Sequence, residues 1–176
     1  MIVEKVIFVI WIGMCLGLGC CGCSSRDKQI HTVSLVRALS ECIDELNEAD
    51  RIALIRELRA VDQKCPNGSN QALLNFLNNR SKLGDAFLVG CGDIGSVLLN
   101  GRLEFHDEWG RPLIIASSDA QRILVSFGKE SFEVTVPDVD GHDVLIWSVG
   151  LDGVNQSGDH DDLSNWFFAQ NVQRHP

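Results

Sequence analysis

The chain has 176 residues, of which 24 are acidic and 15 are basic, and its formal net charge is −9. Its length allows one domain with appendages, and its acidic balance argues against nucleic acid as a partner, because phosphates repel an acidic surface. Hydrophobic residues make up 45% of the chain, but they are distributed unevenly, and a long uncharged run stands near the N-terminus.

Residues 6–22 form this run of seventeen residues without a charged side chain. As a helix it would span roughly 25 Å, slightly less than the ~30 Å hydrocarbon thickness of a bilayer. We therefore interpret residues 1–23 as a membrane anchor or signal segment. One alternative is a single uncleaved span, and another is a lipoprotein signal in which Cys20 receives the lipid. Either alternative predicts a protein at the cell membrane, with a single N-terminal anchor and an extracytoplasmic (periplasmic) body.

Three cysteines, Cys42, Cys65 and Cys91, lie in the body of the chain. Because their number is odd, at most one bridge can form among them. No two of them have C-x-x-C spacing, so a zinc site is not predicted. Small buried thiols are favoured, and the disulfide state is left open.

The polar residues 24–31 are interpreted as a short linker, and residues 32–83 as a helical region. The first helix is expected where apolar residues recur at spacings of three and four. The second is expected over residues 48–63 with Asn47 as its N-cap, and a third, shorter helix has Ser69 as its cap. The apolar faces are predicted to be Leu35, Leu39, Cys42, Ile43 and Leu46 in the first helix, Ile52, Ile55, Leu58 and Val61 in the second, and Leu73, Phe76 and Leu77 in the third.

Residues 84–176 are predicted to form a β domain. Its first part, residues 84–101, holds five glycines; we interpret it as a turn-rich connection and not a phosphate loop, because no G-K-[ST] follows. Four short stretches rich in β-branched or aromatic residues come next. We expect them to form an antiparallel sheet packed on the preceding helices, which makes the fold class α+β. The four strands are predicted at residues 112–116, 122–127, 131–136 and 143–148.

The loop after the last of these strands is dense in carboxylates. Between residues 152 and 162 it holds four aspartates and one asparagine, and neither lysine nor arginine. Carboxylates this close repel one another unless they are solvated or share a cation. Calcium takes about six to eight oxygen ligands, so we predict a calcium site here, against the alternative of a solvated acidic loop without a metal. The candidate ligands are Asp152, Asn155, Asp159, Asp161 and Asp162.

Three motifs in the C-terminal part of the chain resemble those of a known family. They are Asp-Glu-Trp-Gly-Arg-Pro at residues 107–112, Ser-Val-Gly-Leu-Asp-Gly at 148–153 and Asp-Asp-Leu-Ser-Asn-Trp at 161–166. Over roughly the last seventy residues, the chain is similar to the C-terminal domain of type II secretion pseudopilins, most closely the major, G-type one.

This resemblance implies that the loop binds calcium and that the ion holds the C-terminus in shape. Asp152 matches the aspartate of the family's Gly-x-Asp-Gly motif, and Asp162 matches the aspartate that stands shortly before the final tryptophan. The family's other acidic ligand corresponds to His160, which Asp159 and Asp161 flank.

The resemblance also implies a function. It indicates a membrane-anchored, non-catalytic component of a type II secretion or type IV pilus-like apparatus, with the membrane and other pseudopilin or secretion-machinery subunits as partners. Glu4 and the apolar residues after it resemble the start of a mature pilin, which is a third interpretation of the N-terminus. The competing class is a lipid-anchored extracytoplasmic binding or structural domain that is not assembled into a pseudopilus.

No catalytic arrangement emerges from the residue pattern. His106 and Asp107 are adjacent, so their side chains diverge on a strand, and Asp107 is expected to cap the turn after it. The remaining histidines have no metal-binding spacing. We therefore predict that the protein is not an enzyme, and no small-molecule substrate is implied. Trp109, Trp147 and Trp166 are expected to pack in the core.

Overall fold

The computed structural model describes residues 24–61, 64–80, 96–99, 102–157 and 161–166. The predicted anchor at residues 1–23, most of the glycine-rich stretch and the candidate ligand Asp159 lie outside these ranges. No helix among the described residues is long and apolar enough to cross a membrane.

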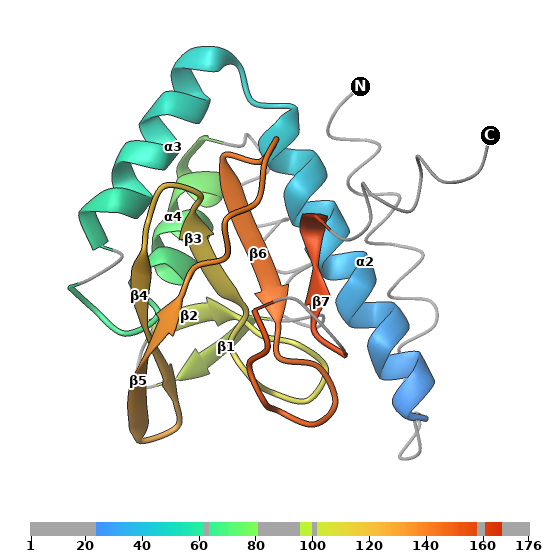
Figure 1. The fold of residues 1–176 in the computed structure, drawn as a ribbon. Coiled ribbons are helices and arrows are strands. Elements are labelled where there is room, and N and C mark those ends of the chain that lie inside the picture. Colours follow the sequence, from blue (N-terminus) through green and yellow to red (C-terminus); the bar gives the residue numbers. More distant parts are fainter. Residues whose placement is uncertain (1–23, 62–63, 81–95, 100–101, 158–160, 167–176) are drawn as a thin grey trace.

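The described residues fold as α+β, which confirms the predicted fold class (Figure 1). The helices are α2 (Ser25–Asp44), α3 (Glu48–Val61) and α4 (Gly68–Arg80), and the strands are β1 (Ser96–Leu99), β2 (Arg102–Phe105), β3 (Ile114–Ser117), β4 (Arg122–Phe127), β5 (Glu130–Thr135), β6 (Val144–Ser148) and β7 (Leu163–Ser164). These strands pair in antiparallel fashion wherever the structure describes them. Within the described ranges they form a sheet of order β3-β6-β7 and two separate pairs, β1-β2 and β4-β5, in place of the single sheet expected.

The first helix begins earlier than predicted. The Ser24 backbone N–H donates to Oδ2 of Asp27 at 3.0 Å, and the Asp27 N–H donates to Oγ of Ser24 at 3.3 Å. This capping box satisfies two backbone donors at the start of α2. The interpretation of residues 24–31 as a linker is therefore wrong, because their polar side chains belong to the largely exposed first turns of an amphipathic helix. Burial of Leu35, Leu39 and Ile43 confirms the predicted apolar face.

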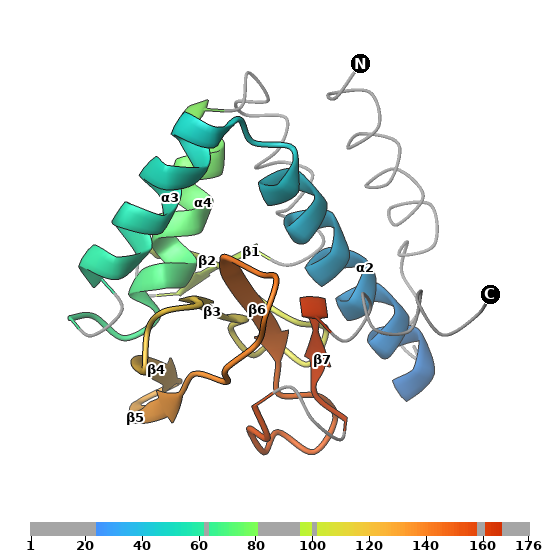
Figure 2. The same cartoon turned by 45° about the horizontal axis from the view of Figure 1, so that its top comes forward.

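α2 and α3 are separate helices that diverge from a bend at residues 45–47 (Figure 2). Asn47 caps α3 as predicted, because its Oδ1 accepts the Asp50 backbone N–H at 3.0 Å. The predicted apolar face is wrong at Ile52, which is 48% exposed, whereas Leu54 is fully buried. Packing of α3 against α4 therefore selects a face turned away from Ile52.

α4 begins at Gly68, directly after Asn67. The Asn67 carbonyl accepts the Gln71 backbone N–H at 3.2 Å, so Asn67 takes the capping place that was predicted for Ser69. Ser69 instead lies buried in the first turn of the helix. The predicted apolar residues Leu73, Phe76 and Leu77 are buried, as expected.

Strands β3 and β6 lie between two apolar clusters. Successive side chains of a strand point to opposite faces, and every residue of both strands is buried. One cluster combines residues of the three helices with Phe105, Leu113, Ile115, Val144 and Ile146. The other lies on the side of the β4–β5 hairpin and comprises Ile114, Ala116, Ile123, Val125, Val134, Val136, Leu145, Trp147, Val149 and Trp166.

Of the three tryptophans expected in the core, two pack in this second cluster. The rings of Trp147 and Trp166 meet edge to face, with centroids 5.6 Å apart. Trp109 is only partly buried and belongs to neither cluster. Its predicted core position is wrong, because its turn extends beyond the paired strands. Of the cysteines in the body, Cys42 and Cys65 are free thiols, and Cys91 lies outside the described ranges.

Candidate functional site

The turn at residues 107–112 is held together by the side chain of Asp107. Its Oδ1 accepts the backbone N–H of Trp109 at 3.0 Å and that of Arg111 at 2.9 Å. The Gly110 N–H donates to the Asp107 carbonyl at 2.9 Å, and Gly110 has a φ of +78°, which glycine adopts without steric cost. The predicted capping role of Asp107 is confirmed.

This turn is bonded directly to the end of β6. The Ser148 hydroxyl donates to Oδ2 of Asp107 at 2.7 Å and accepts the Gly150 N–H at 3.2 Å. Arg111 donates from Nη1 to the Gly150 carbonyl at 2.6 Å. Asp107 and Ser148 are 5% and 0% exposed, so water hardly competes for their bond. Two motifs that lie far apart in the sequence thus form one structural unit.

The loop after β6 is closed by Asp161. Its Oδ2 accepts two neighbouring backbone N–H groups, from Leu151 at 2.7 Å and from Asp152 at 3.0 Å. Asp152 in turn accepts the Val154 N–H at 2.7 Å through Oδ1. Both carboxylates therefore serve the backbone of the loop in which they lie.

Gln156 lies between the two aspartates that match the family motifs. Its backbone N–H donates to Oδ2 of Asp162 at 2.9 Å, and its Nε2 is 3.5 Å from Oδ2 of Asp152. Asn155 accepts the indole N–H of Trp147 at 2.9 Å, which ties the loop to the core. The structure brings four predicted ligands into one loop, namely Asp152, Asn155, Asp161 and Asp162, while Asp159 is outside the described residues.

The protein's own donors engage part of the oxygens of this loop, whereas Oε1 of Gln156 is buried without a hydrogen-bond partner. Each of the four side chains accepts at least one N–H group, and the carbonyls of Gly150 and Leu151 face the Arg111 guanidinium. Among the described residues, no group of three or more His, Cys, Asp or Glu side chains is placed to hold a metal ion. A calcium site needs about six to eight oxygens turned toward one centre. The described residues do not present such a centre, and calcium binding stays a prediction.

Sequence reasoning missed the part that Arg111 takes in the loop. The loop has neither lysine nor arginine between residues 152 and 162, but Arg111 reaches it from a turn 39 residues before Gly150. No local pattern in the sequence signals this contact, because it joins residues 39 positions apart.

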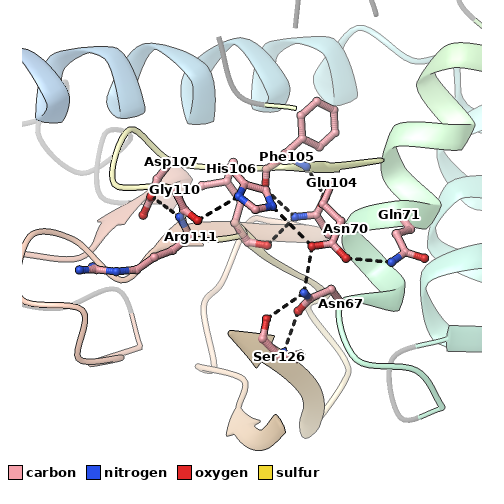
Figure 3. Close-up of polar contacts among 11 residues, drawn as sticks. Asn67, Asn70, Gln71, Glu104, Phe105, His106, Asp107, Gly110, Arg111 and Ser126 are labelled. Atoms are coloured by element: carbon pink, nitrogen blue, oxygen red, sulfur yellow. Dashed lines mark hydrogen bonds and ion pairs between the residues drawn. The ribbon is translucent and has the colours of Figure 1, made fainter. Parts of the chain in front are cut away.

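A second polar cluster surrounds the buried carboxylate of Glu104 (Figure 3). The carboxylate accepts Nε2 of Gln71 at 2.9 Å and Nδ2 of Asn67 at 3.1 Å, and Nε2 of His106 lies 3.6 Å away. Burial raises the pKa of Glu104, but the interactions with His106, Gln71 and Asn67 outweigh it and hold the pKa below its ordinary value of 4.5. Glu104 is therefore a buried anion that neighbouring side chains stabilise.

Two asparagines connect α4 to the strands in the same region. Asn70 donates from Nδ2 to the carbonyls of Phe105 at 2.9 Å and Leu113 at 2.8 Å, and accepts the Phe105 N–H at 2.7 Å. Asn67 bonds both the N–H and the carbonyl of Ser126 in β4. Neither side chain was singled out in the sequence, because their partners are at least 35 residues away.

A cavity of about 600 Å³ lies beside this cluster. Its lining includes Pro66, Pro112 and Phe127 together with Glu104 and His106. Its polar lining includes Asn67 and Glu104, which join α4 to the strands. It also includes His106 and Arg111, which contact the turn at residues 107–112 and the loop after β6.

Comparisons of the chain with protein-family models, curated proteins and solved structures found no match. Any proposal of a function for this chain therefore rests on its sequence motifs and on the geometry of the two polar clusters described above.

His106, Asp107 and Ser148 are neighbours, but they do not form a catalytic triad. Nδ1 of His106 lies 3.1 Å from the Gly110 carbonyl, and its Nε2 faces Glu104. Asp107 bonds the serine hydroxyl directly, whereas a triad places the histidine between them. The predicted divergence of the His106 and Asp107 side chains is confirmed.

Proposed function

We propose that this protein is a non-catalytic, membrane-anchored pseudopilin-like protein of a type II secretion or type IV pilus-like apparatus, with its body in the periplasm. The observation that carries the proposal is the contact between two of the family-like motifs, through Asp107 and Ser148 at 2.7 Å and through Arg111 and Gly150 at 2.6 Å. The antiparallel pairing of β3 with β6, in which Ile114 lies opposite Trp147, places the two motifs at neighbouring strand ends. The direct side-chain contacts between them support the proposal.

The position of α2 supports a tether. α2 begins directly after the predicted anchor at residues 1–23, and its first turn is fixed by the capping box of Ser24. Its apolar face, which includes Val36 and Leu39, belongs to the apolar cluster that the three helices form with Phe105, Leu113, Ile115, Val144 and Ile146. The helix also contacts β6 and β7 (Figure 1). An anchor joined to this helix would therefore hold the sheet close to the membrane.

The buried polar groups favour a structural role over catalysis. The Ser148 hydroxyl is fully buried and bonded to a carboxylate, which leaves it no access to a substrate. Glu104 is held as an anion by neutral donors and His106, whereas a general acid needs a raised pKa. These groups act on the protein's own backbone and side chains.

The alternative is a lipid-anchored extracytoplasmic domain that is not assembled into a pseudopilus. One observation favours it: Ser24, which caps α2, follows Cys20 by only four residues. A lipid on Cys20 would therefore place the first turn of α2 at the membrane surface. Both versions make the chain a tethered domain, and they differ in the chemistry of its N-terminus and in its partners.

The intact mass of the full protein, purified from membranes in detergent, tests both versions. An uncut chain or one trimmed near Glu4 supports the pseudopilin-like version, and a chain that begins with lipidated Cys20 supports the alternative. Cys20→Ser removes the lipid in the second case, whereas Cys21→Ser, one position further along, leaves it in place. A protein found wholly in the soluble fraction contradicts both.

A further inference from the structure

The guanidinium of Arg111 lies against the start of the loop that follows β6 (the C-terminal loop), at Gly150 and Leu151. Nη1 donates to the Gly150 carbonyl at 2.6 Å, and Nη2 lies 3.4 Å from the Leu151 carbonyl. Guanidinium is permanently charged and presents its donors in a rigid plane. One side chain therefore binds two successive carbonyl oxygens, which are the kind of oxygens that a hard cation would otherwise take.

Gly153 marks how closely the guanidinium approaches the loop. A Cβ atom at this position would lie 2.7 Å from Cζ of Arg111 and within 2.9 Å of both terminal nitrogens. A real Cβ atom essentially never makes contacts this short, so any larger residue would displace the guanidinium, which is the flexible end of its side chain, or the loop. Gly153 also has a φ of +73°, which favours glycine. The loop backbone is thus folded around the arginine.

The charges around the arginine are complementary. Asp161 accepts the N–H groups of the same two peptide units whose carbonyls face Arg111, those of Leu151 and Asp152, and Asp152 accepts the N–H of Val154 further along the loop. Between residues 148 and 166 the chain has no lysine or arginine, so the positive charge comes from the turn at residues 107–112.

We infer that Arg111 is the internal cation of this loop: it binds the Gly150 and Leu151 carbonyls in place of a divalent ion and keeps the loop in shape without calcium. This role depends on the contacts of Arg111 alone and holds whether or not the chain belongs to a secretion apparatus. It makes a prediction opposite to that of the calcium site expected from the sequence.

The first test is thermal unfolding of the full chain in detergent. The melting temperature of the native sequence should differ by less than about 1 °C between chelator and millimolar calcium, because a ligand stabilises only a protein that binds it. Arg111→Ala should lower the melting temperature by about 5 °C or more, and Arg111→Lys should restore part of that loss. Arg122→Ala is the matched control, because Arg122 makes an exposed ion pair with Glu133 and its removal should change little.

The second test is a double-mutant cycle at Gly153. Gly153→Ala should lower the melting temperature more than Gly128→Ala, because Gly128 has a similar φ of +66° but open space where a Cβ would lie. In an Arg111→Ala background the two glycine substitutions should cost nearly the same, since the clash is gone and only the backbone strain remains.

Two results would overturn the inference. One is a melting temperature of the native sequence that rises by several degrees when calcium is added after chelation. The other is a Gly153→Ala cost that stays unchanged when Arg111 is removed. If Arg111→Ala does not fold, the calcium comparison and the Arg111→Lys variant still decide the question.

Discussion

The Ser148 hydroxyl donates a hydrogen bond of 2.7 Å to Oδ2 of Asp107, and both side chains are buried. The other carboxylate oxygen of Asp107 holds the backbone of its own turn. One side chain therefore fixes the shape of the turn and joins it to the end of β6. That junction positions Arg111 against the C-terminal loop.

Asp107→Ala should destabilise the protein by about 3 kcal/mol, because it leaves the buried Ser148 hydroxyl and two backbone N–H groups without their acceptor. Ser148→Ala removes one donor to Asp107 and the acceptor of the Gly150 N–H but leaves the turn's own bonds intact, and should cost about 1–2 kcal/mol. Urea unfolding of the two variants measures the difference. Equal costs would show that the turn does not depend on the carboxylate.

Asn70→Ala should cost about 2–4 kcal/mol, because it leaves the backbone groups of Phe105 and Leu113 without their buried partner. Asn75 is a matched control, since it stands exposed in the same helix. Asn75→Ala should change stability by less than about 0.5 kcal/mol. Urea unfolding provides the measurement, and similar costs for both variants would contradict a linking role for Asn70.

Glu104 should contribute to the pH dependence of stability. Its pKa is lower in the folded protein than its ordinary value of 4.5, so the ionised form stabilises the fold. This contribution is complete above pH 4.5 and is lost as the pH falls through the folded pKa. The stability difference between the native sequence and Glu104→Gln should therefore shrink on acidification from about pH 7 to about pH 3. A difference that is independent of pH over this interval would refute the assignment.

The two described cysteines should differ in reactivity. Burial, followed by the charges of Glu45 and Glu41, raises the pKa of Cys42 to about 11, whereas Cys65 is exposed. Because the thiolate is the reactive form, iodoacetamide at about pH 8 should modify Cys42 at least roughly 100-fold more slowly than Cys65. Peptide mass mapping follows both rates, with urea-unfolded protein as the control in which they converge. Comparable rates in the folded protein would contradict the buried position of Cys42.

The elements that local pattern determines were predictable from the sequence. Asn47 caps α3 as its position in the sequence predicts, and the four expected strands are present with boundaries that differ by at most two residues. The misassigned linker at residues 24–31 also had a local signal, since a serine followed three residues later by an acid is a capping pattern. The exposure of Ile52 had no local signal in the sequence, because packing against α4 determines which face of α3 is buried.

The loop after β6 was predictable only in part, because some of its contacts also depend on residues far away in the sequence. Asp152 and Asp162 stand close together in the sequence, and the structure connects both to Gln156. The Arg111 side chain and the Asn70 bonds join segments at least 35 residues apart, and no local pattern encodes such contacts. The divergence of α2 and α3 from a bend likewise follows from packing on the sheet and not from either helix alone.

Photo-crosslinking in the native membrane tests the proposed function most directly. A photoreactive residue in place of Arg37, whose side chain is 71% exposed on α2, probes the helix that follows the anchor, where neighbouring tethered subunits would meet. The pseudopilin-like function predicts crosslinks to further copies of the chain or to secretion subunits. If the protein is found only as an uncrosslinked monomer in the membrane, that function is contradicted.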